Sequence, residues 1–300
     1  MRTLSSWVVL GVLIVLGSRP TWAGDLPEIK SRSAIVMDAE TGAEIFGKDA
    51  DEIRPIASTT KIYVAMAVRR RGIDLDGWTE ITRADAKAAR GGARTRLDVG
   101  KKFKNRDLLR AMLMASDNRA PTALGRAVGL DADGLITAMN KVAKELHLKR
   151  TKFTDASGLR GNVSTAREMA IALRAALEDE VLRRIMGEEL VEVISKDHYA
   201  KITYGNTNQP LVARKYQVTG GKTGYTTAAG YCFITGAKFE NREVVMAFLG
   251  SEGKLTRFGD FNRVASWIDR GAPGSKIATR RPKRTPPKLD VEARGRIAAP

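Results

Sequence analysis

The sequence is poor in the residues that crosslink a chain or hold a metal. Its 300 residues include one cysteine, Cys232, so no disulfide can form within the chain. Histidine is almost as scarce, with only His147 and His198. A structural zinc site of the usual kind needs four closely spaced cysteine or histidine ligands, so we expect no metal site. We interpret both histidines as surface or half-buried residues rather than catalytic ones.

Long apolar runs are missing beyond the N-terminal residues. Residues 1–23 combine Arg2, an apolar run over 7–16 and small residues near Ala23, which is the pattern of a secretory signal peptide. The run is about half of the roughly 20 residues that a membrane-spanning helix needs. We expect cleavage after Ala23 and an exported protein with no stable transmembrane anchor. An uncleaved N-terminal anchor is the alternative.

Acidic residues are few beside basic ones, 34 against 51, which gives a net charge of +17. Such an excess favours an anionic partner but does not define a fold. Residues 271–300 hold eight basic and two acidic residues, are rich in proline and arginine, and have few large apolar side chains. This composition predicts a disordered tail, which we interpret as a solvated extension. A tether to an anionic envelope polymer is the alternative.

Residues 24–270 remain for the folded domain, with strands predicted at both ends and helices between them. Apolar runs around two short turns predict hairpins over 33–48 and 228–250. Helical periodicity predicts helices over 58–71, 106–115, 120–128, 134–146, 166–177 and 257–270. We expect an α+β fold with an antiparallel sheet flanked by helices and a largely helical second lobe. A site would form in the crevice between the two.

The first candidate motif is Ser58-Thr59-Thr60-Lys61, at the start of a predicted helix. A serine and a lysine three residues apart share one helical face, so a neutral lysine amine can take the serine proton. The pair thus forms a nucleophile and its base. Ser251 and Lys254 have the same spacing, but their glycine-flanked position at a strand end predicts a surface turn.

The second motif is Ser116-Asp117-Asn118, directly after a predicted helix. At a break between two helices, the hydroxyl of Ser116 and the amide of Asn118 can both face a cleft, where one relays a proton and the other binds a substrate amide. The alternative is an ordinary helix N-cap formed by Ser116 or Asp117.

The third motif is Lys222-Thr223-Gly224, followed by Tyr225. Its ending resembles a phosphate-binding P-loop, but that motif needs a glycine where the chain has Tyr216, and a helix after it. The segment that follows is predicted to be extended instead. On a strand edge, Lys222 offers a cation, Thr223 a hydroxyl, and Gly224 room for a substrate backbone.

The three motifs in this order resemble the signature of serine β-lactamases and penicillin-binding proteins. Over residues 28–270 the chain is similar to the D-alanyl-D-alanine carboxypeptidase and endopeptidase family of low-molecular-mass penicillin-binding proteins. Stretches 114–120, 205–208 and 253–261 most resemble the periplasmic D-alanyl-D-alanine endopeptidase branch. The resemblance implies a DD-peptidase/β-lactamase-like fold, a periplasmic location and no cofactor.

The resemblance also implies roles for the motif residues. Ser58 would attack the carbonyl of the penultimate D-alanine and form an acyl-enzyme, with Lys61 as its base. Ser116 would pass a proton to the leaving amine, and Asn118 would hold the peptide amide. Lys222 would supply positive potential for the substrate carboxylate.

Three further motif positions complete the implied substrate-binding set: Thr223, Gly224 and Tyr225. The backbone N–H groups of Ser58 and Tyr225 would form the oxyanion hole. The implied partners are peptidoglycan stem peptides and crosslinks, together with β-lactams as acylating inhibitors, and no nucleic acid. The choice between removing a terminal D-alanine and cutting a crosslink stays open, as does the oligomeric state.

Three alternatives were weighed against this interpretation. A class A β-lactamase needs a glutamate in an E-x-x-L-N segment, which Glu145 approaches, but Lys149 replaces the asparagine. We therefore expect Glu145 to be a surface residue. A Ser-His-Asp hydrolase lacks its G-x-S-x-G elbow. A non-catalytic, basic peptidoglycan-binding protein would have no need of the pair Ser58 and Lys61.

Overall fold

The computed structural model of the protein describes residues 26–93, 95–240 and 242–272. The predicted signal peptide, and all but the first two residues of the tail predicted over 271–300, lie outside them. Among the described residues, no helix is both long enough and apolar enough to cross a membrane.

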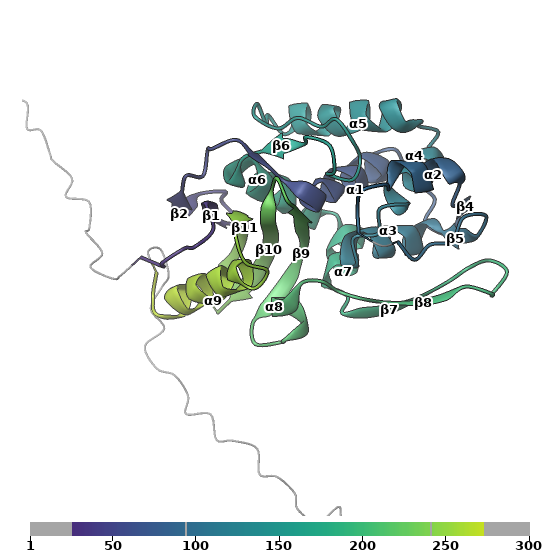
Figure 1. Cartoon of the computed structure of the whole chain (residues 1–300). Coiled ribbons are helices and arrows are strands. Elements are labelled where there is room, and N and C mark those ends of the chain that lie inside the picture. The colour runs from purple at the N-terminus through teal and green to yellow at the C-terminus, as the bar shows by residue number, and fades with distance from the viewer. Residues whose placement is uncertain (1–25, 94, 241, 273–300) are drawn as a thin grey trace, which may run out of the picture.

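A five-stranded antiparallel sheet joins the two ends of the described chain (Figure 1). Its strand order is β2-β1-β11-β10-β9, so β9 lies at one edge. Both predicted hairpins are confirmed, and the pairing of β1 with β11 unites them in one sheet. The strands are β1 (Ser33–Asp38), β2 (Glu44–Lys48), β9 (Gln217–Thr226), β10 (Gly230–Phe239) and β11 (Arg242–Ser251).

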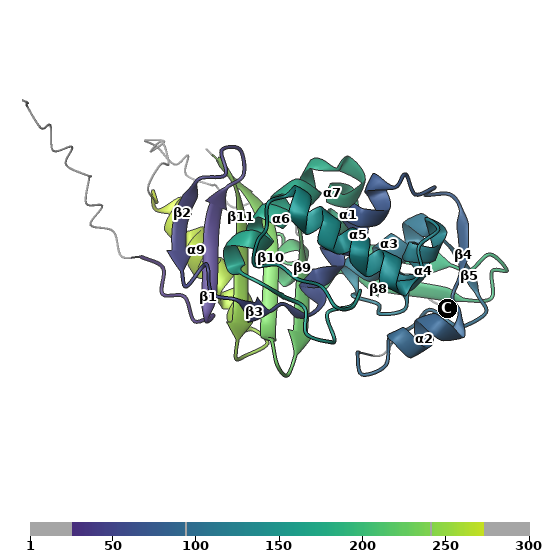
Figure 2. The same ribbon diagram turned by 90° about the horizontal axis from the view of Figure 1, so that it is seen from above.

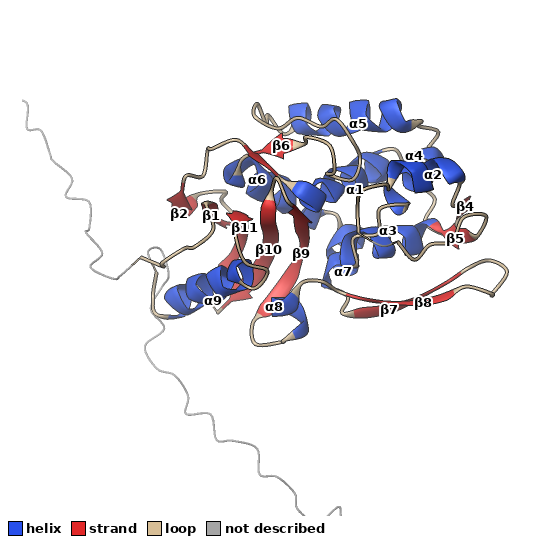
Figure 3. Ribbon diagram, viewed as in Figure 1, coloured by secondary structure: helices blue, strands red, loops and turns tan. Residues whose placement is uncertain are grey.

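Both faces of this sheet are covered, which explains why its central strands are continuously apolar. In β11, alternate side chains such as Met246 and Phe248 pack against α9 (Thr256–Asp269) on one face. Their neighbours Val245 and Ala247 belong to the larger core shared with the helical lobe. The alternation follows from the two-residue period of a strand. Figure 3 shows the sheet between α9 and the helix α6 (Ala166–Glu178).

The helical lobe is built around α1, in which every residue from Lys61 to Val68 is buried. Figure 2 shows this lobe beside the sheet. The helices predicted over 106–115, 120–128, 134–146, 166–177 and 257–270 are confirmed within two residues at each end. The helices of the lobe are α1 (Lys61–Arg70), α2 (Arg83–Ala88), α3 (Asn105–Met114), α4 (Ala120–Ala127), α5 (Ala132–Glu145), α6 (Ala166–Glu178) and α7 (Glu180–Gly187).

Several short elements were not predicted. Three two-stranded ribbons form from β3 (Arg54–Pro55) with β6 (Val163–Ser164), β4 (Trp78–Glu80) with β5 (Lys102–Lys104), and β7 (Leu190–Ile194) with β8 (Lys201–Gly205). The short helix α8 (Gln209–Val212) precedes β9. The helix predicted over 58–71 was wrong at its start, because η1 (Ala57–Thr60) is a 3-10 turn and α1 begins at Lys61.

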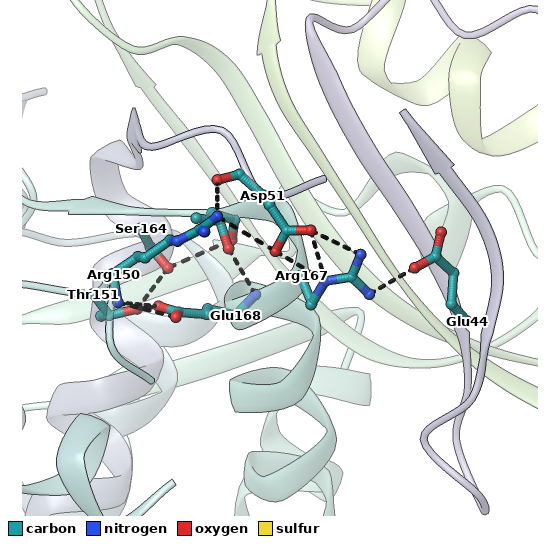
Figure 4. A network of polar contacts seen from close by, with 8 residues as sticks. Glu44, Asp51, Arg150, Thr151, Ser164, Arg167 and Glu168 are labelled. Atoms are coloured by element: carbon teal, nitrogen blue, oxygen red, sulfur yellow. Dashed lines mark hydrogen bonds and ion pairs between the residues drawn. The ribbon is translucent and has the colours of Figure 1, made fainter. Parts of the chain in front are cut away.

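A polar network joins the segment before β3 and the loop after α5 to the start of α6 (Figure 4). The carboxylate of Glu168 accepts hydrogen bonds from the Arg150 N–H and the Thr151 hydroxyl. Arg167 contacts both Asp51 and Glu44. The network therefore ties the chain that enters β3 to the loop that follows α5.

Asp260 in α9 is a fully buried carboxylate that holds the N-terminal segment in place. It accepts hydrogen bonds from the backbone N–H groups of Lys30 and Ser31, each at 2.8 Å, and also contacts Arg263. The Ser31 hydroxyl bonds to the same carboxylate and lies 2.6 Å from the hydroxyl of Ser251 at the end of β11. One side chain thus joins the start of the described chain to the sheet and α9.

We predict that Asp260→Ala lowers the free energy of unfolding by about 3 kcal/mol, because it leaves buried donors without an acceptor. Asp133→Ala, at an exposed position in the first turn of α5, should change it by less than about 1 kcal/mol. Urea unfolding followed by circular dichroism measures both. Equal losses in the two variants would contradict the role of Asp260.

Candidate active site

Ser58 lies in η1, where the chain turns from β3 into α1. The turn starts at Ala57, whose φ of 47° is in the left-handed region and prevents the α-helix from starting earlier. Gly158 permits this arrangement, since a Cβ there would lie 1.9 Å from the Ala57 carbonyl oxygen. The Ser58 hydroxyl is 3.3 Å from the Ser157 carbonyl oxygen, which it can donate to. In a 3-10 turn residues i and i+3 eclipse, so Lys61 is placed directly beside Ser58.

The Lys61 amine lies at the centre of the predicted catalytic group. Its Nζ is 2.9 Å from the Ser58 hydroxyl oxygen, 3.1 Å from the Ser116 hydroxyl oxygen and 2.6 Å from Oδ1 of Asn118. It also lies 3.0 Å from the Ser116 carbonyl oxygen. An ammonium has three N–H donors and no lone pair, whereas a neutral amine has two donors and can accept from a serine hydroxyl. The geometry therefore suits a proton shared between Lys61 and the two serines.

Burial sets the protonation of this lysine. Removal of water from the fully buried amine lowers the Lys61 pKa to about 7, although the carboxylates of Asp117 and Asp155 act in the opposite direction. Above that pH the amine is free to accept a proton. Burial, aided by the charges of Lys61 and Arg257, also lowers the pKa of Lys222 well below its ordinary value.

The second motif turns two of its side chains toward Lys61 and the third, that of Asp117, elsewhere. Ser116 has a φ of 65° and, with Asn118, contacts Lys61. The buried carboxylate of Asp117 accepts from the backbone N–H groups of Arg96 and Arg119 and from the Tyr204 hydroxyl. The N-cap alternative was wrong, because Arg119 occupies the N-cap of α4 and no side chain caps it. Asp117 instead anchors the loop to β8.

The third motif lies on β9, the edge strand, and is followed by β10 rather than a helix, so the P-loop alternative is excluded. Lys222 is 1% exposed, and its Nζ donates to the Thr223 carbonyl at 2.7 Å. A Cβ at Gly224 would lie 2.8 Å from the Ser58 nitrogen and 3.0 Å from the Thr59 nitrogen. The β9 backbone therefore runs directly beside the nucleophile motif, as the absence of a side chain at this position allows.

The residues before and after Gly224, Thr223 and Tyr225, each contact a side chain of another segment. The hydroxyl oxygens of Thr223 and Thr207 lie 2.7 Å apart, and Thr207 is fixed by two hydrogen bonds to the Met114 carbonyl. Tyr225 is 51% exposed and stacks on Tyr231 with ring centroids 4.2 Å apart. Thr207 thus connects the end of α3, just before the second motif, to the third motif.

Arg257 is a residue that the motifs did not reveal. Its buried guanidinium lies behind β9, where Nη1 donates to the carbonyls of Gly224 at 2.7 Å and Cys232 at 3.0 Å. It also packs over the rings of Tyr231 and Phe258. Burial lowers its pKa to about 10, so it stays charged near neutral pH. The strands β10 and β11 separate Arg257 from Gly224 in the sequence, so no local pattern connects the two residues.

The loop between α5 and β6 was also missed. The Asp155 carboxylate accepts from the backbone N–H groups of residues 157–160 and shapes the turn that carries the Ser157 carbonyl. The side-chain amide of Asn162 donates to the Thr60 hydroxyl in η1. A cluster of Asp, Ser, Gly and Asn in this stretch was a usable loop signal.

The other candidates lie apart from this group. Ser251 ends β11 and Lys254 lies in the following turn, so no helix presents the pair, although Ser251 is buried rather than at the surface as predicted. Glu145 is exposed and pairs with Arg70, as expected of a surface residue. Both histidines are exposed. Within the described residues, no cluster of three or more metal-type side chains occurs.

The chain is similar to known proteins over most of its length. The family model described as D-alanyl-D-alanine carboxypeptidase matches residues 21–253. The chain is 31% identical to the D-alanyl-D-alanine endopeptidase of Escherichia coli (strain K12), covering 82% of this chain and 79% of that protein. It is 30% identical to the enzyme of the same name from Pseudomonas aeruginosa, covering 90% and 88%. The DD-transpeptidase of Streptomyces K15 is 25% identical, with a TM-score of 0.77 and coverage of 82% and 100%.

We predict that Lys61 titrates near pH 7, where an ordinary lysine has a pKa near 10.4. Asp117→Asn should lower the Lys61 pKa further, because the carboxylate favours the ammonium. NMR titration of the lysine Nζ signals, assigned with a Lys61→Met variant, measures both values. A Lys61 pKa near 10, or a rise on removing the Asp117 charge, would contradict the electrostatic argument.

Proposed function

Because the chain belongs to the D-alanyl-D-alanine carboxypeptidase family, whose members are penicillin-binding serine DD-peptidases, we propose that Ser58 is its nucleophile. The observation that carries this proposal is the contact of a buried lysine with both motif serines and Asn118. The scissile bond would be a D-alanyl bond in a peptidoglycan stem peptide or crosslink. No metal or cofactor takes part in the proposed reaction.

Acylation would begin with the free amine of Lys61 accepting the Ser58 proton as Oγ attacks the carbonyl carbon. The Ser116 hydroxyl contacts the same amine at 3.1 Å, so it is placed to receive that proton and deliver it to the leaving nitrogen. The Asn118 carbonyl oxygen is already bound to Lys61, which leaves its NH₂ group for a substrate carbonyl. The acyl-enzyme ester is then hydrolysed by water.

The backbone would stabilise the developing oxyanion. The close approach of Gly224 to the Ser58 nitrogen brings the N–H groups of Ser58 and Tyr225 into the same region. Lys222 and Thr223 precede Gly224 on β9, where the Thr223 hydroxyl and the Lys222 amine, whose protonated form a nearby anion would favour, would bind the carboxylate that follows the scissile bond. Arg257 would hold the strand between these two groups in position.

We propose that crosslinks are cut in the periplasm. The endopeptidase names of the Escherichia coli and Pseudomonas aeruginosa relatives support this choice of substrate. The signal-peptide pattern of residues 1–23 supports export. An assay with purified crosslinked and uncrosslinked muropeptides tests the substrate, because an endopeptidase releases two monomers whereas a carboxypeptidase releases free D-alanine.

The central experiment is intact mass spectrometry of the protein mixed with benzylpenicillin. We expect a persistent adduct of one drug mass, absent from Ser58→Ala. Ser251→Ala, which changes the other serine with a lysine three residues later, should keep the adduct. Turnover of the drug without a lasting adduct would identify a β-lactamase instead. An adduct that survives in Ser58→Ala would overturn the assignment of the nucleophile.

We predict that Gly224→Ala slows acylation by benzylpenicillin at least about 100-fold, because the added Cβ would push β9 away from the Ser58 and Thr59 nitrogens and disturb the oxyanion donors. Gly205→Ala is the matched control: this glycine also lies in a strand, and the nearest atom to its Cβ would be 3.9 Å away. Stopped-flow acylation rates make the comparison. Equal rates in both variants would argue against backbone contact as the reason for Gly224.

A further inference from the structure

The direction of a bound substrate follows from the proposed function. The carboxylate beyond the scissile bond would lie at Lys222 and Thr223, and the scissile carbonyl at the N–H groups of Ser58 and Tyr225. The substrate therefore runs antiparallel to β9: its C-terminal carboxylate lies near Lys222, and its preceding residues lie toward Tyr225 and beyond. The part that stays on the enzyme as the acyl group must leave Ser58 past Tyr225, toward the turn that joins β9 to β10.

A cavity of about 390 Å³ lies at this turn. It is bounded by Tyr225 and Thr227 on the β9 side and by Pro55, three residues before Ser58, on the other. Figure 2 shows β3 beside this end of the sheet. A strand advances about 3.3 Å per residue, so the substrate residue directly before the penultimate D-alanine would place its side chain at the cavity.

The cavity is lined by two guanidinium groups, and one of them is fixed. Arg54 is 17% exposed, and its Nε donates to the Ser33 hydroxyl at 2.7 Å, while Nη2 binds Glu52 at 2.5 Å. These bonds hold the head group in one orientation. Its other terminal nitrogen, Nη1, makes no hydrogen bond with the described residues.

The second guanidinium, Arg32, is available at the rim. Its side chain is 60% exposed and meets Glu252, itself 84% exposed, at 3.5 Å, so the pair is weak. Arg32 crosses the end of β11 at Gly250, where a Cβ would lie 3.2 Å from the Arg32 Cβ. Each arginine already meets one carboxylate, Glu52 for Arg54 and Glu252 for Arg32. The Nη1 of Arg54, which is free within the described residues, and the weak pairing of Arg32 nevertheless leave donors at the cavity for an anionic group.

We propose that this cavity is a subsite for a carboxylate carried by a side chain on the acyl-donor side of the substrate, bound by Arg54 and Arg32. This proposal rests on the proposed function, which supplies the direction of the substrate. The planar guanidinium matches a carboxylate with two parallel hydrogen bonds, which gives orientation as well as attraction. The subsite would select among stem peptides by the charge of one side chain.

The test uses two model crosslink peptides in which a D-alanyl bond joins two short peptides. They differ only at the residue before that D-alanine, which is glutamate in one and glutamine in the other. We expect wild-type kcat/KM to be about tenfold higher for the glutamate peptide, the effect of a charge-assisted hydrogen bond. Arg54→Gln and Arg32→Gln should each reduce this preference toward one. Arg184→Gln, at an exposed site in α7, should retain it.

Acylation by benzylpenicillin shows whether a negative result concerns the proposed subsite or the proposed function. Benzylpenicillin has no carboxylate on its acyl side, so we expect its acylation rate to be unchanged in Arg54→Gln and Arg32→Gln, which also shows that both variants fold. Equal kcat/KM for the two peptides in the wild type, or a preference that survives in both arginine variants, would overturn the subsite while acylation persists. Absence of acylation in the wild type would overturn the proposed function itself.

Discussion

The burial of one amine is the constraint on which the rest of the site depends. Lys61 lies inside the protein with no exposed surface, and its four polar contacts come from η1 and from the loop that follows α3. An amine in this position is stable without a permanent charge only because serine and asparagine oxygens replace water around it. The surrounding helices therefore exclude solvent from Lys61, while Ser58 beside it keeps 8% of its surface exposed.

Much of this arrangement could be predicted because the relevant signals are local. Periodicity placed the long helices, and a serine three residues before a lysine identified the pair that the structure brings to 2.9 Å. The start of the first helix was wrong because Ala57 has a left-handed φ, in a turn for which Gly158, a residue about 100 positions away, leaves room. Propensity alone gives no account of such a constraint.

Other parts of the site could not be read from local patterns. Arg257 looks like an ordinary helical residue until the fold places it behind Gly224 and Cys232. The alternating pattern of β7 was a usable strand signal, but the buried contact of Tyr204 in β8 with Asp117 depends on tertiary structure. Motifs thus identify the atoms that react, whereas the groups that position them are assembled from distant segments.

Because of the strand order, the site can assemble only after the last strand of the sheet has been synthesised. The strand β11 lies between β1 and β10, so the edge strand β9 can take its place beside Ser58 only after residues beyond 250 are available. A nascent chain that ends before β11 would therefore have Ser58 and Lys61 but would lack the Tyr225 N–H and the carboxylate site of β9 opposite them. The strand order thus delays assembly of the whole site until the last strand has been synthesised, so the proposed activity would need no separate inhibitor before that point.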